Sequence, residues 1–145
     1  MKKLLLSLLY LPFFFVLSGL FARSVLAAAC VGSSCYPTIQ EAVDVANTGD
    51  TITIQNGTYT DPVIISKSIT IFGEDKNLTI VQTGASNIGF SLLAGADNVV
   101  IKNLKLTGNG EGINASGVSN LVLQDLIVSD NFCKYYWVNI YKQHY

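Results

Sequence analysis

The sequence predicts an all-β solenoid, in which each turn of the chain stacks on the turn before it. The first observation is a repeat: residues 98–109 read NVVIKNLKLTGN and residues 120–131 read NLVLQDLIVSDN, an offset of 22 (120 − 98). The second is a series of short apolar segments separated by Asn, Gly and Asp. A period in the twenties built from such segments indicates turns that bury their apolar faces only by stacking.

Five positions are identical between the two wider units of the repeat, residues 88–109 and 110–131. They are Gly95/Gly117, Asn98/Asn120, Val100/Val122, Leu104/Leu126 and Asn109/Asn131. We expect the Asn pairs to stack as side-chain ladders, or to hold turns in the left-handed conformation that Asn tolerates. Both roles are structural.

Residues 1–29 have the pattern of an export signal. Lys2 and Lys3 form a basic start, residues 4–21 are apolar, and Ala27-Ala28-Ala29 supplies the small residues that precede a cleavage site. The alternative is an uncleaved anchor, because 18 apolar residues (4–21) are just long enough to span a bilayer, although Pro12 and Ser18 interrupt them. We therefore predict an exported protein, and the Lys-Lys start with a short leader is of the bacterial type.

The chain after the signal is mildly acidic. It has six Lys, ten acidic residues and no Arg beyond Arg23, so its net charge is 6 − 10 = −4. Nucleic acids and anionic membranes are bound through clustered basic side chains. The composition therefore disfavours both as partners, and no membrane span is expected after residue 29.

Two of the three cysteines lie close together near the start of the mature chain. A Cys30–Cys35 disulfide would close a small loop and hold down a terminus that otherwise frays. The alternative is that Cys30, directly after three Ala, is the lipidated first residue of a lipoprotein, although a lipobox usually has Leu where Ala27 stands. An oxidising compartment, as for exported proteins, favours the disulfide.

One helix is predicted, at about residues 38–46. Thr38 can cap its start, and Glu41 three residues later completes a capping box. The first turn of a solenoid has no neighbour on its outer side, so its core and strand edges need a cover. We expect this helix to be that N-terminal cap.

From residue 51 the pattern alternates, as it does in strands with one buried face. The expected strands lie at residues 51–54, 58–60, 63–65, 69–72, 78–81, 99–101 and 104–106. With a period of 22, residues 51–131 hold 81/22, or about four, turns.

Residues 36–74, YPTIQEAVDVANTGDTITIQNGTYTDPVIISKSITIFGE, resemble the N-terminal cap and first coil of proteins of the pectin-lyase-like superfamily. The similarity runs from about residue 30 to residue 131. It implies a right-handed, single-stranded parallel β-helix with an N-terminal capping α-helix. Exported proteins of this type often begin with a paired-Cys segment, which also favours the disulfide.

The same region is similar to that of pectin methylesterases, and this resemblance implies two catalytic Asp, Gln side chains at the oxyanion and an Arg. Gln124-Asp125 is similar to such a Gln-Asp pair. However, it occupies the repeat position of Lys102-Asn103, a turn between two strands, and the mature chain has no Arg. We therefore assign no catalytic residue and no cofactor, and expect the protein not to be an enzyme.

The sequence gives little support for glycoside hydrolysis, for calcium binding or for a histidine-based site. Asp97, Asp125 and Asp130 would lie on stacked turns, where a pair of carboxylates could hydrolyse a glycoside, but Asp is also a common turn residue. No dense acidic cluster predicts calcium, and the only histidine, His144, is next to the last residue. No metal site is expected.

Residues 132–145 fall outside the repeat and hold the only Trp. They are either an atypical cap or an extension of a truncated or frame-shifted member of the superfamily. Two functions stay open: a non-catalytic exported module that binds a polysaccharide or cell-surface polymer, and the N-terminal part of a pectin-esterase- or lyase-like enzyme without its catalytic coils.

Overall fold

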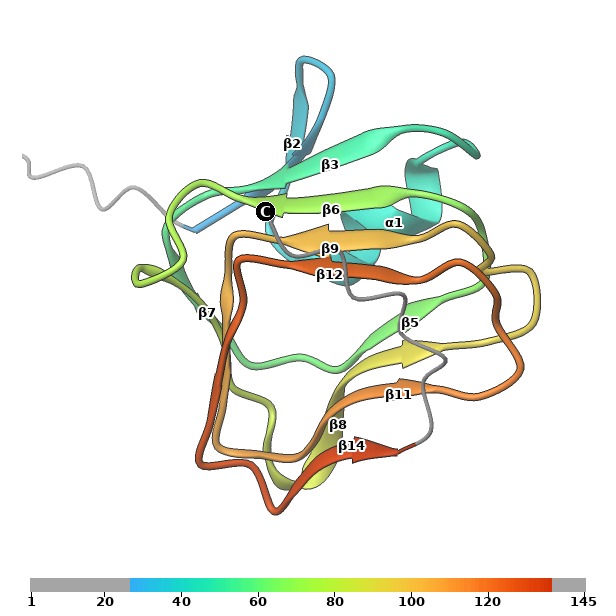
Figure 1. The fold of residues 1–145 in the computed structure, drawn as a ribbon. Helices are drawn as coiled ribbons and strands as arrows, with labels where there is room; N and C mark the ends of the chain where they lie inside the picture. The colour runs from blue at the N-terminus through green and yellow to red at the C-terminus, as the bar shows by residue number, and fades with distance from the viewer. Residues whose placement is uncertain (1–26, 137–145) are drawn as a thin grey trace, which may run out of the picture.

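The computed structural model describes residues 27–136, and within them the chain forms a parallel β-solenoid of about four turns (Figure 1). Each turn contributes one strand to each of three sheets. Sheet A has the order β12-β9-β6-β3-β1-β2, sheet B the order β13-β10-β7-β4, and sheet C the order β14-β11-β8-β5. The prediction of a mostly β solenoid is confirmed.

The strands are short, as the sequence predicts, except for two in sheet C. The strands of sheet A are β1 (Ala29–Val31), β2 (Ser34–Tyr36), β3 (Thr51–Ile54), β6 (Thr70–Gly73), β9 (Val100–Lys102) and β12 (Val122–Gln124). Those of sheet B are β4 (Gly57–Tyr59), β7 (Thr79–Val81), β10 (Lys105–Thr107) and β13 (Ile127–Ser129). Those of sheet C are β5 (Val63–Ile65), β8 (Gly84–Leu92), β11 (Asn109–Ala115) and β14 (Cys133–Tyr136).

The turns differ in length. Along sheet A the register advances by 19 (70 − 51) from Thr51 to Thr70, by 30 (100 − 70) from Thr70 to Val100, and by 22 (122 − 100) from Val100 to Val122. The expectation of a uniform period of 22 is therefore wrong for the first two steps. The number of turns comes out near four because the short step and the long step offset each other.

The solenoid also continues past residue 131, where we expected it to end. Strand β14 pairs in parallel with β11, with Glu111 opposite Cys133 and Ile113 opposite Tyr135. Both pairs again have an offset of 22 (133 − 111 and 135 − 113). The expected boundary is therefore too early, because the aromatic composition of this segment hides a strand that follows the repeat.

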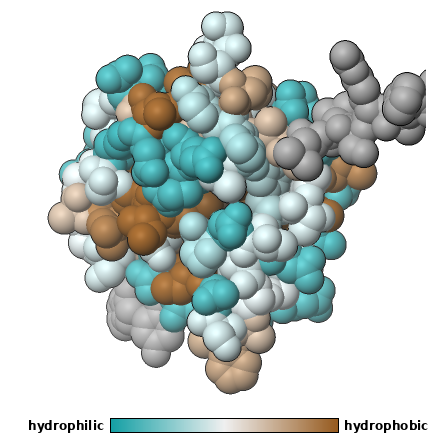
Figure 2. Space-filling view, turned by 180° about the vertical axis from the view of Figure 1, so that it is seen from behind, coloured by the Kyte–Doolittle hydropathy of each residue, from teal (hydrophilic) through white to brown (hydrophobic). Residues whose placement is uncertain are grey.

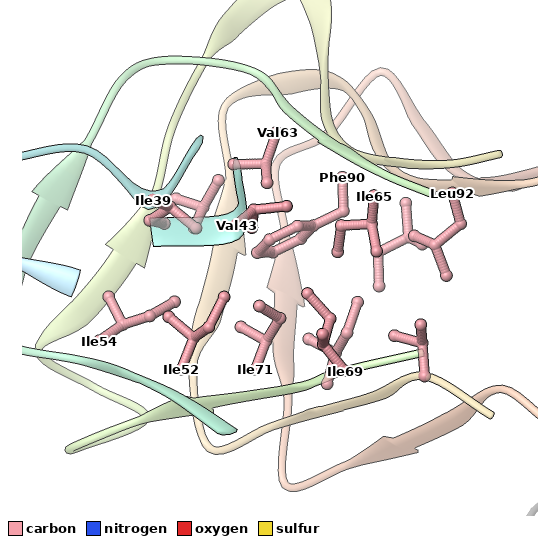
Figure 3. Close-up of a cluster of buried hydrophobic side chains, with 14 of the residues drawn as sticks. Ile39, Val43, Ile52, Ile54, Val63, Ile65, Ile69, Ile71, Phe90 and Leu92 are labelled. Atoms are coloured by element: carbon pink, nitrogen blue, oxygen red, sulfur yellow. The ribbon is translucent and has the colours of Figure 1, made fainter. Parts of the chain in front are cut away.

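Alternating side chains from the three sheets fill the interior. Figure 3 shows members of this core from sheets A and C and from helix α1. In β3, Ile52 and Ile54 are fully buried while Thr51 is exposed, and β6 buries Ile71 in the same way. Phe90 of β8 is the largest side chain in this cluster that is entirely removed from solvent. Burial of such a set of aliphatic and aromatic groups is the main contribution to stability in a chain of this size.

The predicted helix forms as α1 (Ile39–Val45), one residue shorter at each end than expected. Thr38 is its N-cap, and its hydroxyl oxygen accepts a hydrogen bond of 3.1 Å from the backbone N–H of Glu41. Ile39, Ala42 and Val43 are buried against the solenoid core. In Figure 3, Ile39 and Val43 point into the cluster formed by the first turns.

Helix α1 is joined to the first turn by polar contacts as well. The amide of Gln40 meets the edge strand β5: the N–H of Ile64 donates to Gln40 Oε1 at 2.7 Å, and Gln40 Nε2 donates to the Ile64 carbonyl at 3.3 Å. Lys67 Nζ donates to the carbonyls of Val43 and Ala46 at the end of the helix, at 3.0 and 2.8 Å. The free backbone groups of a strand edge and of a helix terminus are thereby satisfied.

The N-terminal segment adds a hairpin that the sequence did not predict. Strand β1 is antiparallel to both β2 and β3, so it extends sheet A beyond the first turn. Cys30 and Cys35 lie directly opposite each other in this hairpin and form a disulfide. This bond links β1 to β2 across the two-residue turn at Gly32 and Ser33.

Residues 1–26, most of the predicted export signal, and residues 137–145 lie outside the described range. Residues 27–29 of the predicted signal do lie inside it, and Ala29 opens β1. In the described part of the chain, no helix has the length and apolar character needed to cross a bilayer.

Candidate functional site

The outer face of sheet A presents one continuous row of side chains. The register pairs Cys30 with Thr53, Thr53 with Phe72, Phe72 with Lys102, and Lys102 with Gln124. Because side chains alternate between the two faces of a strand, residues paired across parallel strands point to the same side. The four side chains from Thr53 to Gln124 therefore form an outward ladder, which we call the sheet A row.

Phe72 is the aromatic member of the sheet A row. Its neighbours in β6, Ile71 and Gly73, are buried, whereas Phe72 itself is only partly buried. The Lys102 ammonium lies 5.1 Å from the centre of the Phe72 ring, within the range of a cation–π interaction. A flat apolar ring and hydrogen-bond donors thus lie side by side on one exposed surface.

A ladder of polar residues runs along the corner before sheet A. Asn120 Nδ2 donates to Asn98 Oδ1 at 3.0 Å, and the two residues have φ of 55° and 58°. They therefore both stack and hold left-handed turns, a conformation that Asn adopts more readily than most residues. Asn98 and Asn120 occupy equivalent turn positions on successive turns.

The second Asn pair lies inside the solenoid. Asn109 is 1% exposed and Asn131 is 9% exposed, and Asn109 Nδ2 donates to Asn131 Oδ1 at 2.8 Å. Asn109 Oδ1 accepts from the backbone N–H and the hydroxyl of Thr83, at 2.6 and 2.8 Å. Thr83, Asn109 and Asn131 thus form a buried polar ladder at the corner between sheets B and C, and they have no left-handed backbone.

Asp97 takes part in the outer corner ladder. Its carboxylate oxygen Oδ1 accepts from the hydroxyl of Ser119 at 2.6 Å and from the Ser119 backbone N–H at 2.7 Å. The Ser119 hydroxyl, and then its N–H, hold the pKa of Asp97 below its ordinary value of 3.8. Hydrogen bonds to the charged form favour ionisation, so Asp97 serves as a turn-to-turn link.

The Asp97 link predicts a pH dependence of stability. Because the pKa of Asp97 is lower in the folded chain than in the unfolded chain, its contribution is fully present above 3.8 and is lost as the pH falls through the folded value. Asp97→Asn should therefore flatten the loss of stability on acidification. Urea unfolding measured from neutral to acidic pH tests this, with Asp61→Asn as a control for removal of one exposed carboxylate. An equal flattening in both variants would contradict the assignment.

The structure does not stack the three candidate carboxylates on one another. Asp97 precedes β9 and is bonded to Ser119, while Asp125 follows β12 and Asp130 follows β13. By register, Asp125 lies over Asn103 and Asp130 over Gly108. Each of Asp125 and Asp130 therefore lies over a residue that is not acidic, and the carboxylate pair considered from the sequence does not form.

Gln124-Asp125 occupies a strand end followed by a turn. Gln124 pairs with Lys102 in sheet A, and Asp125 has φ of 50°, matching the 58° of Asn103 one turn earlier. Asn103 Nδ2 in turn donates to the Gly73 carbonyl at 2.6 Å. The equivalence of these turns agrees with a structural role for Asp125, while Gln124 belongs to the sheet A row.

Apolar side chains also reach the surface. Figure 2 shows hydrophobic residues gathered in one region of the face seen from behind, next to strongly hydrophilic ones. Val45 at the end of α1, Ile64 in β5 and Leu93 after β8 are each about half exposed, at 50%, 51% and 50%. These three lie on connected elements, since the Leu93 N–H donates to the Ile65 carbonyl and Gln40 bonds Ile64.

Within residues 27–136, no group of three or more His, Cys, Asp or Glu side chains is close enough to hold a metal ion. Comparisons with known proteins give no significant match, whether with family models, curated proteins or solved structures. The candidate site therefore has to be judged on its geometry and chemistry.

The sheet A row was not predicted from the sequence. The repeat aligned Lys102-Asn103 with Gln124-Asp125 at an offset of 22 (124 − 102), but Phe72 precedes Lys102 by 30 (102 − 72) and follows Thr53 by 19 (72 − 53). Thr53 is the third residue of the expected strand at residues 51–54, but Lys102 lies just after the expected strand at residues 99–101. The expected strand bounds therefore do not bring these side chains together.

Proposed function

We propose that the protein is an exported, non-catalytic β-helix module that binds a polysaccharide or another cell-surface polymer along sheet A. The observation that carries this proposal is the sheet A row, in which an aromatic ring, an ammonium and an amide stand on adjacent strands. Rigid strands preorganise these groups, so little side-chain ordering is needed on binding.

The spacing of the row suits a linear polymer. Adjacent strands lie about 4.8 Å apart, so the three steps from Thr53 to Gln124 extend over about 14 Å. Phe72 offers a partly exposed apolar ring that a sugar can contact. Lys102, whose ammonium lies over that ring, and Gln124 offer hydrogen-bond donors for hydroxyl or carboxylate groups. A site with an apolar platform and a few placed polar groups is typical of ligand recognition.

We infer that the solenoid is right-handed and related to the pectin-lyase-like superfamily, with α1 as its N-terminal cap. The contacts of Gln40 with the β5 edge and of Lys67 with the end of α1 support the capping role. The Gln40 contact satisfies backbone groups of the β5 edge that would otherwise favour edge-to-edge association.

Export to an oxidising compartment is supported by the disulfide. Cys30 and Cys35 are bonded across the β1–β2 hairpin, and such bonds persist mainly outside the cytosol. A polymer-binding role outside the cell is consistent with that placement. The proposed partner is thus an extracellular or envelope polymer, with no requirement for a cofactor.

Binding to a panel of neutral and acidic polysaccharides, measured by affinity electrophoresis and calorimetry, tests the proposal. For a polymer that binds, Phe72→Ala should raise the Kd about tenfold, because truncating a central aromatic contact commonly costs more than about 1 kcal/mol. Lys102→Ala should weaken binding as well, and its effect should shrink at high salt if the polymer is acidic.

Lys105→Ala provides the matched control, because Lys105 belongs to the outward row of sheet B, with Thr58, Ile80 and Ile127. It should leave binding unchanged. Equal losses for Lys102→Ala and Lys105→Ala, or no binding to any polymer, would count against the proposal. Release of methanol, unsaturated ends or reducing sugar by the exported protein would instead favour the enzyme alternative.

A further inference from the structure

The three alanines of the predicted cleavage pattern are part of the folded solenoid. Ala29 is 0% exposed and pairs with Ile54 on one side and Tyr36 on the other. The Ala28 carbonyl accepts a hydrogen bond of 2.9 Å from the Gln55 N–H. It also lies 2.9 Å from the Tyr59 hydroxyl, which donates to it.

Ala27 fills a space beside the first turn. Its Cβ lies so close to Gly57 that a side chain built on that glycine would clash with it. Ala27 is partly buried and packs against the hydrophobic core. Strand β4, which contains Gly57, is the outermost strand of sheet B, so residues 27 and 28 lie at an edge that no other strand within residues 27–136 covers.

Cleavage directly before Cys30, which the Ala27-Ala28-Ala29 pattern predicts, would remove all of these contacts. The Gln55 N–H would lose its partner, the Tyr59 hydroxyl would keep only the Gln55 carbonyl, and the core would lose a fully buried residue. Unsatisfied buried polar groups and lost core contacts both destabilise a folded chain. The new charged amino group would also stand within strand β1, which pairs on both sides.

We infer that the protein is processed upstream of Ala28, so that the mature chain keeps Ala28 and Ala29. This inference rests on the proposed export. Two other patterns of suitable residues at the positions three and one before a cut are present: Ala22 with Ser24, and Val25 with Ala27. Cuts after these patterns leave Val25 or Ala28 as the first residue, and both preserve the contacts of Ala28 and Ala29.

The same inference assigns Cys30 to the disulfide and not to a lipid. Lipoprotein processing would make Cys30 the first residue and would attach the lipid to its sulfur. In the structure that sulfur is bonded to Cys35. Retention of Ala28 and lipidation of Cys30 are therefore mutually exclusive.

The test is the first residue of the exported protein, determined by intact mass and N-terminal sequencing after expression of the full chain in an exporting bacterial host. A first residue between Lys2 and Ala28, with a mass two hydrogens below that of the reduced chain, supports the inference. A first residue at Ala29 or Cys30, with or without a lipid, overturns it while leaving export intact. Retention of Met1 would show the uncleaved anchor in place of a cleaved signal and would overturn the inference as well.

A second measurement compares two exported versions whose leader is replaced so that they begin at Ala28 or at Cys30. The shorter version should have a Tm lower by about 4 °C or more, because in a domain of this size each lost kcal/mol shifts Tm by several degrees. If the version that begins at Cys30 cannot be recovered in folded form, this result also supports the inference. Equal Tm values would overturn the inference, since they would show that residues 28 and 29 contribute nothing.

Discussion

Replacing Asn109 with Ala is expected to destabilise the protein by about 3–5 kcal/mol, the sum of several lost hydrogen bonds at a buried site. Asn109 uses all of its polar atoms: Oδ1 accepts twice from Thr83, and Nδ2 donates to the carbonyl of Val81 at 3.2 Å and to Asn131. Truncation leaves the Thr83 N–H and the Val81 carbonyl without these partners. A buried group that loses its partner costs about 1–3 kcal/mol.

Urea unfolding of the variant measures this loss as a lower midpoint at unchanged slope. Asn114→Ala is the matched control, because Asn114 lies on the same strand but is only partly buried, and its amide donates to the Glu111 carboxylate. It should cost less than about 1 kcal/mol.

An isosteric variant separates hydrogen bonding from packing. Asn109→Asp keeps the shape of the side chain but turns the donor Nδ2 into an oxygen that faces two acceptors, the Val81 carbonyl and Asn131 Oδ1. It should therefore be destabilised at neutral pH, because one oxygen of the buried carboxylate keeps the two Thr83 donors but the other faces only acceptors. Wild-type stability in Asn109→Asp would contradict the ladder.

The buried polar ladder was predicted from the sequence only in part. Asn109 and Asn131 occupy equivalent positions of the repeat, so their stacking was predicted from their identity. Thr83, the third member, precedes Asn109 by 26, outside that period. No pattern in the sequence links it to the pair, because the turn that contains Thr83 has a different length.

Strand β8 of sheet C was not predicted from the sequence, for a different reason. Strands such as β3 were predicted because apolar and polar residues alternate in Thr51–Ile54, whereas β8 begins with four exposed residues, Gly84 to Asn87, and contains a second glycine at Gly89. That glycine is required by close packing, since a Cβ at this position would lie 2.6 Å from the Gly112 carbonyl oxygen. Glycine normally weakens a strand. Residue propensities therefore do not predict β8, which forms because tertiary packing requires it.

The candidate site is harder to predict than the fold for the same reason. The strands of sheet A outside the hairpin were recognised, directly or through the repeat, but the sheet A row depends on which residues face one another across strands. The unequal offsets on the two sides of Phe72, 19 to Thr53 and 30 to Lys102, decide that pairing. They follow from the lengths of connections, which loop sequences specify only loosely. The row could be assigned only once the register was known.

The largest expected effect of a single truncation in the core is at Phe90. Its side chain is 0% exposed, stands between Val63 and Ile113 in the register of sheet C, and points into the cluster shared with α1 (Figure 3). Phe90→Ala should destabilise the protein by about 3–5 kcal/mol, through lost transfer free energy and the cavity left behind. Since a domain of this size has only about 5–15 kcal/mol in total, the variant should lose a large fraction of its stability.

Phe132 gives the matched control, because it is the same residue type at 86% exposure. Phe132→Ala should change the free energy of unfolding by no more than about 0.5 kcal/mol. Phe90→Leu should lower the free energy of unfolding by less than Phe90→Ala does, because it leaves a smaller cavity. Unfolding in guanidinium, with the Cys30–Cys35 bond intact, measures the free energy of unfolding of the three variants and shows which of them loses most. If Phe132→Ala cost as much as Phe90→Ala, then Phe132 would have to be buried in solution, against its 86% exposure in the structure.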